Sequence, residues 1–194
     1  MTLKQTPSQT VGPYFAYGLL PEQYGYPYTG VHGPVMCGED EAGEHVRIVG
    51  RVIDGAGKAV NDAMIELWQA DAQGRYPHPA DPRGKEISFK GVGRCGTGTN
   101  ADNHFSFDTI KPAAIGDGQA PHINAIVTMR GILSHAYTRI YFSDEAKANA
   151  ADPVLSSVPG ERRRTLISAD IGLARTAGCV PGLTRSSDVA SMKL

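Results

Sequence analysis

The chain has 194 residues, which is enough for one domain with a sizeable core, with or without extended arms. Its formal net charge is −1 with acids and bases interspersed, so it lacks the basic face that nucleic-acid binding requires. No apolar stretch approaches the length of a membrane span, and 23 glycines with 13 prolines favour turns and short strands over long helices.

The first 44 residues predict an extended arm with turns rather than core secondary structure, because five prolines are spread through them with glycines between. The same stretch contains six aromatic residues within positions 14–28. Disordered tails are usually poor in aromatic residues. We therefore expect this arm to lie across another surface.

After residue 44, five segments show the two-residue alternation of half-buried strands. In the first, at residues 45–54, Val46 and Ile48 alternate with Arg47 and Arg51, and an Asp-Gly turn follows. The other four predicted strands lie at residues 63–69, 105–109, 123–129 and 138–142. Strands at this spacing, with turn signals between them, predict an antiparallel β-sandwich.

Two short helices are expected beyond these strands, at residues 143–150 and 160–167, with Ser143 as the N-cap of the first. The last 26 residues have no two-residue apolar alternation and no aromatic side chain. The sequence thus predicts an all-β protein with an arm (1–44), a sandwich (45–168) and a divergent, poorly ordered C-terminal tail (169–194). An edge strand of the sandwich would then lack its partner.

Cysteine usage and the start of the chain bear on the cell compartment. Cys37, Cys95 and Cys179 are odd in number, widely spaced and form no CxxC pair. This pattern argues against a disulfide framework or a thiolate zinc site and is typical of a reducing compartment. The first fifteen residues have no apolar segment of the secretory type. We therefore expect a cytoplasmic protein.

Without a resemblance to known proteins, few residues suggest a functional site. None of the six histidines forms an HxH or HExxH pair. His122 and Asn124 lie two apart in a predicted strand and face the same side, but an amide is a much weaker ligand than an imidazole. His122 fits a half-buried, hydrogen-bonded histidine, and Tyr76 fits a loop packing residue that binds ferric iron only as a phenolate.

Several segments, in order and at consistent spacing, resemble the intradiol ring-cleavage dioxygenases. They are TPSQTVGPYF (6–15), RVIDGAGKAVNDAMIELWQADAQGRY (51–76), GVGRCGT (91–97), FDTIKP (107–112) and APHIN (120–124). Working members of this family hold Fe(III) through two tyrosines and two histidines. Tyr76 and His122 match the first of each, whereas Ile115 and Asn124 stand at the other two positions. Gln119 stands where the family has an arginine.

This pattern is similar to that of the non-catalytic α subunits of two-chain members. The resemblance implies that a homologous catalytic β subunit holds the Fe(III), and that this chain alone has no complete metal site and no activity. It also implies cleavage of a small aromatic acid, 3,4-dihydroxybenzoate, with O2 to 3-carboxy-cis,cis-muconate in the β-ketoadipate pathway. The assembly implied is an (αβ)n hetero-oligomer without nucleic acid or membrane.

The resemblance also implies a substrate-pocket wall that this chain lends to its partner. Thr10, Gly12, Pro13 and Tyr14 of the arm would form that wall, and Arg130 would favour the substrate carboxylate. An arginine at a strand end is equally typical of a surface or interface charge. Three other readings stay open: a non-enzymatic binding module, a pseudoenzyme acting alone, and a self-sufficient dioxygenase, which Ile115 and Asn124 disfavour.

Overall fold

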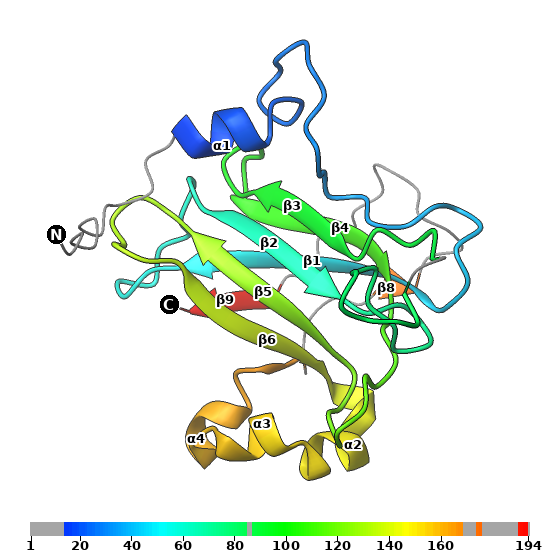
Figure 1. The fold of residues 1–194 in the computed structure, drawn as a ribbon. Coiled ribbons are helices and arrows are strands. Elements are labelled where there is room, and N and C mark those ends of the chain that lie inside the picture. Colours follow the sequence, from blue (N-terminus) through cyan, green and yellow to red (C-terminus); the bar gives the residue numbers. More distant parts are fainter. Residues whose placement is uncertain (1–13, 85–86, 169–173, 176–189, 194) are drawn as a thin grey trace, which may run out of the picture.

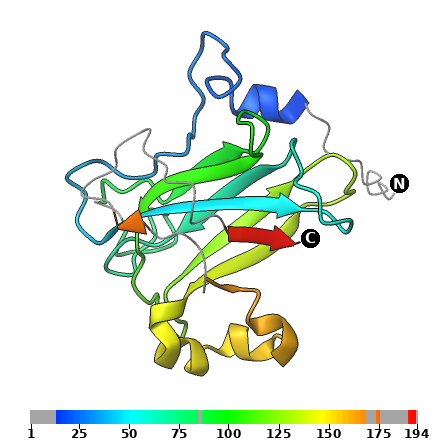
Figure 2. The same ribbon diagram turned by 180° about the vertical axis from the view of Figure 1, so that it is seen from behind.

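Two β-sheets packed face to face form the body of the protein, and short helices lie at its two ends (Figures 1 and 2). The computed structural model describes residues 14–84, 87–168, 174–175 and 190–193. The predicted all-β sandwich is confirmed. Within these described ranges, no helix is long and apolar enough to cross a membrane.

The first sheet has five strands, all antiparallel to their neighbours except for the last pair. In spatial order they are β3 (Val92–Gly96), β2 (Met64–Gln69), β5 (His122–Thr128), β6 (Ala136–Phe142) and β7 (Ile167–Ser168). Alternate residues of β5, namely Ile123, Ala125 and Val127, are fully buried, which is the predicted period. The sequence patterns did not predict β3, because its five residues include two glycines and an arginine.

The second sheet is built around β1 (His45–Ile53), which pairs along most of its length with β4 (His104–Ile110). Its other edge is hydrogen-bonded to β8 (Ala174–Arg175) and, in parallel, to β9 (Ala190–Lys193). The expectation that an edge strand lacks its partner is therefore wrong for β1, because two short segments of the tail supply that partner (Figure 2).

The core between the sheets takes part of its contents from the predicted arm. Met36 and Cys37 belong to the main core cluster, and Leu20 is also buried. Met36 fits there because Gly93 on β3 has no side chain: an added Cβ would lie 2.6 Å from the Met36 Cγ. The arm also contains α1 (Tyr14–Leu19). Residues 14–44 are thus partly core structure rather than only an extended arm.

Two sequence expectations about individual residues are wrong. Arg47, predicted on the exposed face of its strand, is buried and forms a bidentate ion pair with Asp108, which lies opposite it on β4. The pair satisfies both charges, so burial is tolerated. Cys37 is disulfide-bonded, while Cys95 is a buried free thiol.

The helical region after β6 is divided into four short pieces: η1 (Ser143–Glu145), α2 (Ala146–Ala151), α3 (Pro153–Ser157) and α4 (Gly160–Arg163). Ser143 does not cap, since Phe142 occupies that position and no side-chain cap bond forms. The second predicted helix ends at Arg163, because the chain then turns into β7. Asp152 is a true N-cap and accepts the Leu155 N–H at 2.7 Å.

Candidate functional site

Three side chains lie in one row across the first sheet. In the strand register, Asn124 of β5 lies between Trp68 of β2 and Arg139 of β6. His122, two residues before Asn124, faces the same side of β5. Two loops close over this end of the sheet, one after β2 and one before β5. The cluster therefore combines residues that are remote along the chain, from Trp68 to Arg139.

Tyr76 lies in the loop after β2, where its ring stacks on Trp68 with 5.4 Å between centroids and an interplanar angle of 11°. Its backbone N–H donates to Asp81 Oδ2 at 3.0 Å, which fixes the loop beneath it. Its hydroxyl accepts a hydrogen bond from Asn124 Nδ2 at 3.3 Å. The phenol is thus held against the indole and the amide.

His122 is buried, and its ring is oriented by the chain just before it. Its Nδ1 lies 2.8 Å from the Ala120 carbonyl oxygen, so Nδ1 carries the proton and Nε2 is left as an acceptor. That Nε2 is buried without a hydrogen-bond partner among the described residues. Burial lowers the pKa of His122, and the Arg139 charge also lowers it, although the Ala120 carbonyl acts in the opposite sense. His122 is therefore neutral at pH 7.

Ile115 lies in the second loop, which packs closely on the loop that carries Tyr76. Gly74 makes this approach possible: its φ is +73°, and a Cβ there would overlap the carbonyl oxygen of Ala114. The Ala113 N–H also donates to the Asp71 carbonyl oxygen at 3.0 Å. The chain then turns back between Gly116 and Gln119, which form an isolated bridge.

Arg139 joins the second loop to the sheet. Its guanidinium Nη1 donates to Gln119 Oε1 at 3.0 Å and to the Tyr141 hydroxyl at 3.3 Å. The sequence patterns do not single out Arg139. It lies in a predicted strand, and no spacing rule distinguishes it from an ordinary surface arginine. Only the pairing of β6 with β5 brings it to the cluster.

The donors present do not fit a ferric ion. They are one phenol and one imidazole, since Ile115 is a hydrocarbon and Asn124 is an amide that already binds the phenol. Burial raises the pKa of the Tyr76 phenol, although Asn124 and Arg139 act in the opposite sense, so the neutral form prevails at pH 7. Among the described residues, no group of three or more His, Cys, Asp or Glu side chains could hold a metal.

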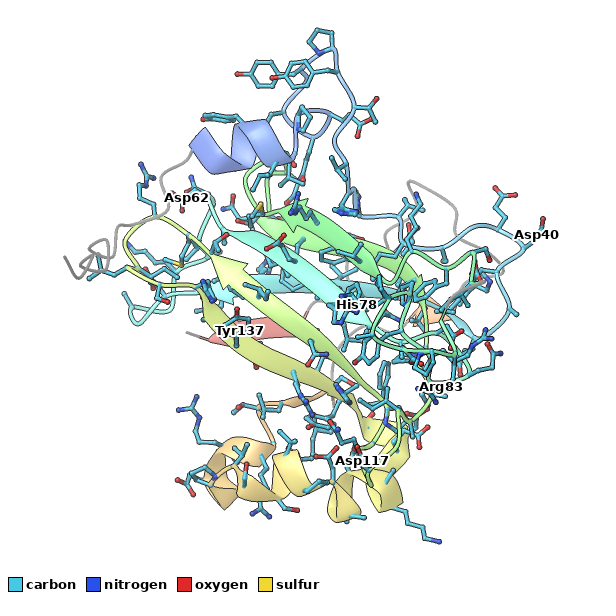
Figure 3. The ribbon with its side chains drawn as sticks, viewed as in Figure 1. Asp40, Asp62, His78, Arg83, Asp117 and Tyr137 are labelled. Carbon is cyan, nitrogen blue, oxygen red and sulfur yellow. The ribbon has the colours of Figure 1, made fainter. Side chains whose placement is uncertain are left out.

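A solvent-open cavity of about 590 Å³ lies beside the stacked rings. Its lining residues come from β2 and from the following loop: Trp68, Tyr76, His78, Ala80, Asp81, Pro82 and Arg83. His78 meets the Trp68 ring edge-on, and Arg83 is ion-paired with Asp81 at 2.8 Å. Figure 3 shows His78 and Arg83 together at this end of the first sheet. The cavity offers an aromatic wall but no uncommitted arginine.

Comparison with known proteins decides the family. The profile of the family described as "Dioxygenase" matches residues 29–170. The chain is 56% identical over 167 residues to the protocatechuate 3,4-dioxygenase alpha chain of Burkholderia cepacia, with 86% of this chain and 84% of that one covered. The chain belongs to the intradiol dioxygenase family.

The identity of this intradiol dioxygenase chain to alpha chains exceeds its identity to a beta chain. It is 41% identical over 172 residues to the protocatechuate 3,4-dioxygenase alpha chain of Pseudomonas putida, covering 86% of this chain and 84% of that one. The corresponding beta chain of Burkholderia cepacia is 36% identical over 134 residues, which cover 65% of this chain and 56% of the beta chain.

Solved structures support the fold of this intradiol dioxygenase. The dioxygenase domain of a carbohydrate-binding fusion protein from Streptomyces sp. SirexAA-E superposes with a TM-score of 0.53 at 18% identity, over 97% of this chain and 98% of that one. Hydroxyquinol 1,2-dioxygenase from Pseudomonas putida DLL-E4 gives 0.53 at 17% identity, over 93% and 72%. At such identities the likeness concerns the fold.

Arg130, which was expected at the partner's pocket, lies away from the Tyr76 cluster in this dioxygenase chain. Arg130 follows the end of β5 rather than belonging to it. Its side chain is 62% exposed, and its Nε lies 2.7 Å from Asp62 Oδ2, in an ion pair without hydrogen-bond alignment. Figure 3 shows Asp62 far along the first sheet from His78. Thr10, Gly12, Pro13 and the Tyr14 side chain lie outside the described residues.

Proposed function

We propose that this chain is the α subunit of a protocatechuate 3,4-dioxygenase. In this proposal, a separate β chain holds the Fe(III) and cleaves 3,4-dihydroxybenzoate with O2 to 3-carboxy-cis,cis-muconate. This chain supplies subunit contacts and one wall of the substrate pocket. The proposed assembly is a cytoplasmic (αβ)n hetero-oligomer, in which the chain alone is inactive.

The observation that carries the proposal is the donor count. The chain shares 56% identity with an alpha chain, yet its cluster has one phenol and one imidazole where a working site of this family has four side-chain ligands. A family member with only two of the four ligands cannot bind ferric iron tightly by itself. Its role is therefore expected in the complex rather than in the chemistry.

Exposed aromatic side chains on the arm support a partner surface. Tyr17, Tyr26 and Tyr28 are 39%, 44% and 54% exposed. The ring of Tyr26 contacts the rings of both Tyr17 and Tyr28. Between Tyr17 and Tyr26 in the chain, Gln23 anchors the arm to its own sheet through the carbonyl and N–H of Gly96. Tyrosines of this kind are enriched in protein interfaces. In Figure 1, this part of the arm projects beyond the sandwich.

Co-expression with a catalytic β chain tests the proposal. We expect the two chains to co-purify with one iron per αβ pair, turnover of 3,4-dihydroxybenzoate, and the red colour of tyrosinate-to-iron charge transfer. This chain alone should be colourless and inactive. Tightly bound iron with a tyrosinate band in the chain alone would contradict the division of roles, and separate elution of the two chains would contradict the partnership.

The pocket-wall role has its own test within that complex. Arg130→Ala should raise KM for 3,4-dihydroxybenzoate by roughly tenfold, because a charge-assisted contact to the substrate carboxylate is lost. Arg83→Ala is a matched control, because Arg83 is also exposed and ion-paired but lies at the opposite end of the sheet. Equal effects of the two variants on KM would contradict a role of Arg130 in the substrate pocket.

A further inference from the structure

The cluster around Tyr76 contains a fixed positive charge. Arg139 lies directly opposite Asn124 in the strand register, and its guanidinium is held by Gln119 and Tyr141. Among the described residues, no carboxylate forms an ion pair with it. Its charge acts on the Tyr76 phenol and on the His122 ring alike, as the direction of both pKa effects shows.

The surroundings keep this guanidinium in place. Gln119 Oε1 and the Tyr141 hydroxyl lie on two different elements, so Arg139 is held from the loop and from its own strand. The Tyr141 hydroxyl also lies 3.3 Å from Asp152 Oδ1, a buried carboxylate with two backbone partners. A side chain with several fixed partners does not swing away at little cost.

A guanidinium fixed beside a phenol and an imidazole opposes a metal there. The guanidinium never loses its proton, so its charge is permanent. A ferric ion placed near it would feel repulsion in partly desolvated surroundings, where charges interact more strongly than in water. We propose that the permanent positive charge of Arg139 takes the place of a metal's charge in this cluster and excludes ferric iron from it. The two missing donors and the fixed charge of Arg139 then act together against iron binding.

The test restores the missing donors and then varies the charge alone. Ile115→Tyr with Asn124→His returns a phenol and an imidazole to the cluster, and Arg139→Gln or Arg139→Lys is added to that background. Each full-length chain is co-expressed with the β chain, and Fe(III) is titrated against a competing chelator. Iron per αβ pair and the tyrosinate charge-transfer band report binding independently of turnover.

Removing the charge should raise the affinity of the restored cluster for Fe(III) at least tenfold and add a second iron per pair. Arg139→Lys keeps the charge and should behave as the two-residue background does. Equal affinities with arginine, lysine and glutamine at position 139 would overturn the proposal, and so would a lysine variant that matches the glutamine variant. These comparisons distinguish the effect of charge on Fe(III) affinity from the effect of side-chain packing.

Folding and assembly are controlled separately. Thermal melts of every variant show whether the chain folds, and Arg139→Met replaces Arg139→Gln if the latter aggregates. The inference rests on the proposed function only in taking this chain to be free of iron. If the two chains fail to assemble, the proposed function fails, while the same titrations on the chain purified alone still compare arginine, lysine and glutamine.

Discussion

At the scale of single residues, the buried carboxylate of Asp152 connects the cluster to the helical region. It accepts the N–H of Ala120 at 2.8 Å and that of Leu155 at 2.7 Å. The Ala120 carbonyl in turn holds the ring of His122. Asp152 is thus the N-cap of α3 and, through Ala120, a positioning residue for His122.

Asp152→Ala should lower the free energy of unfolding by about 2–4 kcal/mol, because a helix cap is lost and two buried N–H groups are left unpaired. Urea denaturation at pH 7 measures the loss. Asp40→Ala is the matched control, since Asp40 is an exposed aspartate, and its replacement should change stability by less than about 0.5 kcal/mol. Equal effects of the two variants would show that the hydrogen bonds of Asp152 contribute nothing.

The contribution of Asp152 should also depend on pH. Burial by itself raises the pKa of this carboxyl, but the N–H groups of Leu155 and Ala120 outweigh burial, so its pKa in the folded chain is lowered. A lowered pKa stabilises the folded chain above the unfolded value of about 3.9, and this stabilisation disappears as pH falls through the folded value. The stability gap between the native chain and Asp152→Ala should therefore be full at pH 7 and shrink below about pH 4. A constant gap down to pH 2.5 would contradict this sign.

At the scale of elements, the contact between the loop after β2 and the loop before β5 determines where Tyr76 and Ile115 lie. Asp71 shapes the first loop by accepting the N–H groups of Gln73 and Arg75, each at 2.9 Å. Gly74 allows the second loop to approach. The geometry of the cluster thus depends on a backbone approach as much as on its side chains.

Gly74→Ala tests that approach. Both Gly74 and Gly57 have positive φ, at +73° and +80°, but a Cβ at Gly57 meets nothing within 4 Å. Gly57→Ala should therefore lower the free energy of unfolding by about 1–2 kcal/mol, because only backbone strain at positive φ is added. Gly74→Ala should lower it by at least about 2 kcal/mol more and displace the loops, because the added Cβ also overlaps the second loop. Urea denaturation measures the costs, and the fluorescence of Trp68 reports the displacement. Equal costs would mean that the second loop moves aside freely.

At the scale of the whole molecule, the two candidate functional regions lie at opposite ends of one strand. The Tyr76 cluster lies at the start of β5, and Arg130 lies just past its end. Seven residues of strand at roughly 3.3 Å each separate them by more than about 20 Å. A surface offered to a partner near Arg130 is therefore independent of the altered cluster, and the chain can keep one while losing the other.

The C-terminal tail gives a prediction for the whole chain. Residues after 168 have little apolar alternation, although β8 and β9 pair with β1. Replacing residues 169–194 with the ending of the Burkholderia cepacia alpha chain should raise the melting temperature by several degrees, because the present tail has little apolar alternation with which to bury surface against β1. Melting at the same temperature before and after the exchange would show that the present tail stabilises the sandwich equally well.

Much of the sandwich could be predicted because its signals are local. Five strands were expected from alternation, and each lies where it was expected, within a few residues. The loss of two iron ligands could also be predicted, because the side-chain chemistry of Ile115 and Asn124 is known from the sequence alone. Short-range periodicity and side-chain chemistry require no knowledge of pairing.

Other features depend on which segments meet. The burial of Arg47 follows from its position opposite Asp108, and the place of Met36 follows from the absence of a side chain at Gly93. Arg139 became part of the cluster only when β6 paired with β5 in one register. The sequence by itself determined the strand pattern and the loss of iron ligands. Only the tertiary structure decided which charge takes their place, because electrostatic energy depends on distances between residues that are remote along the chain.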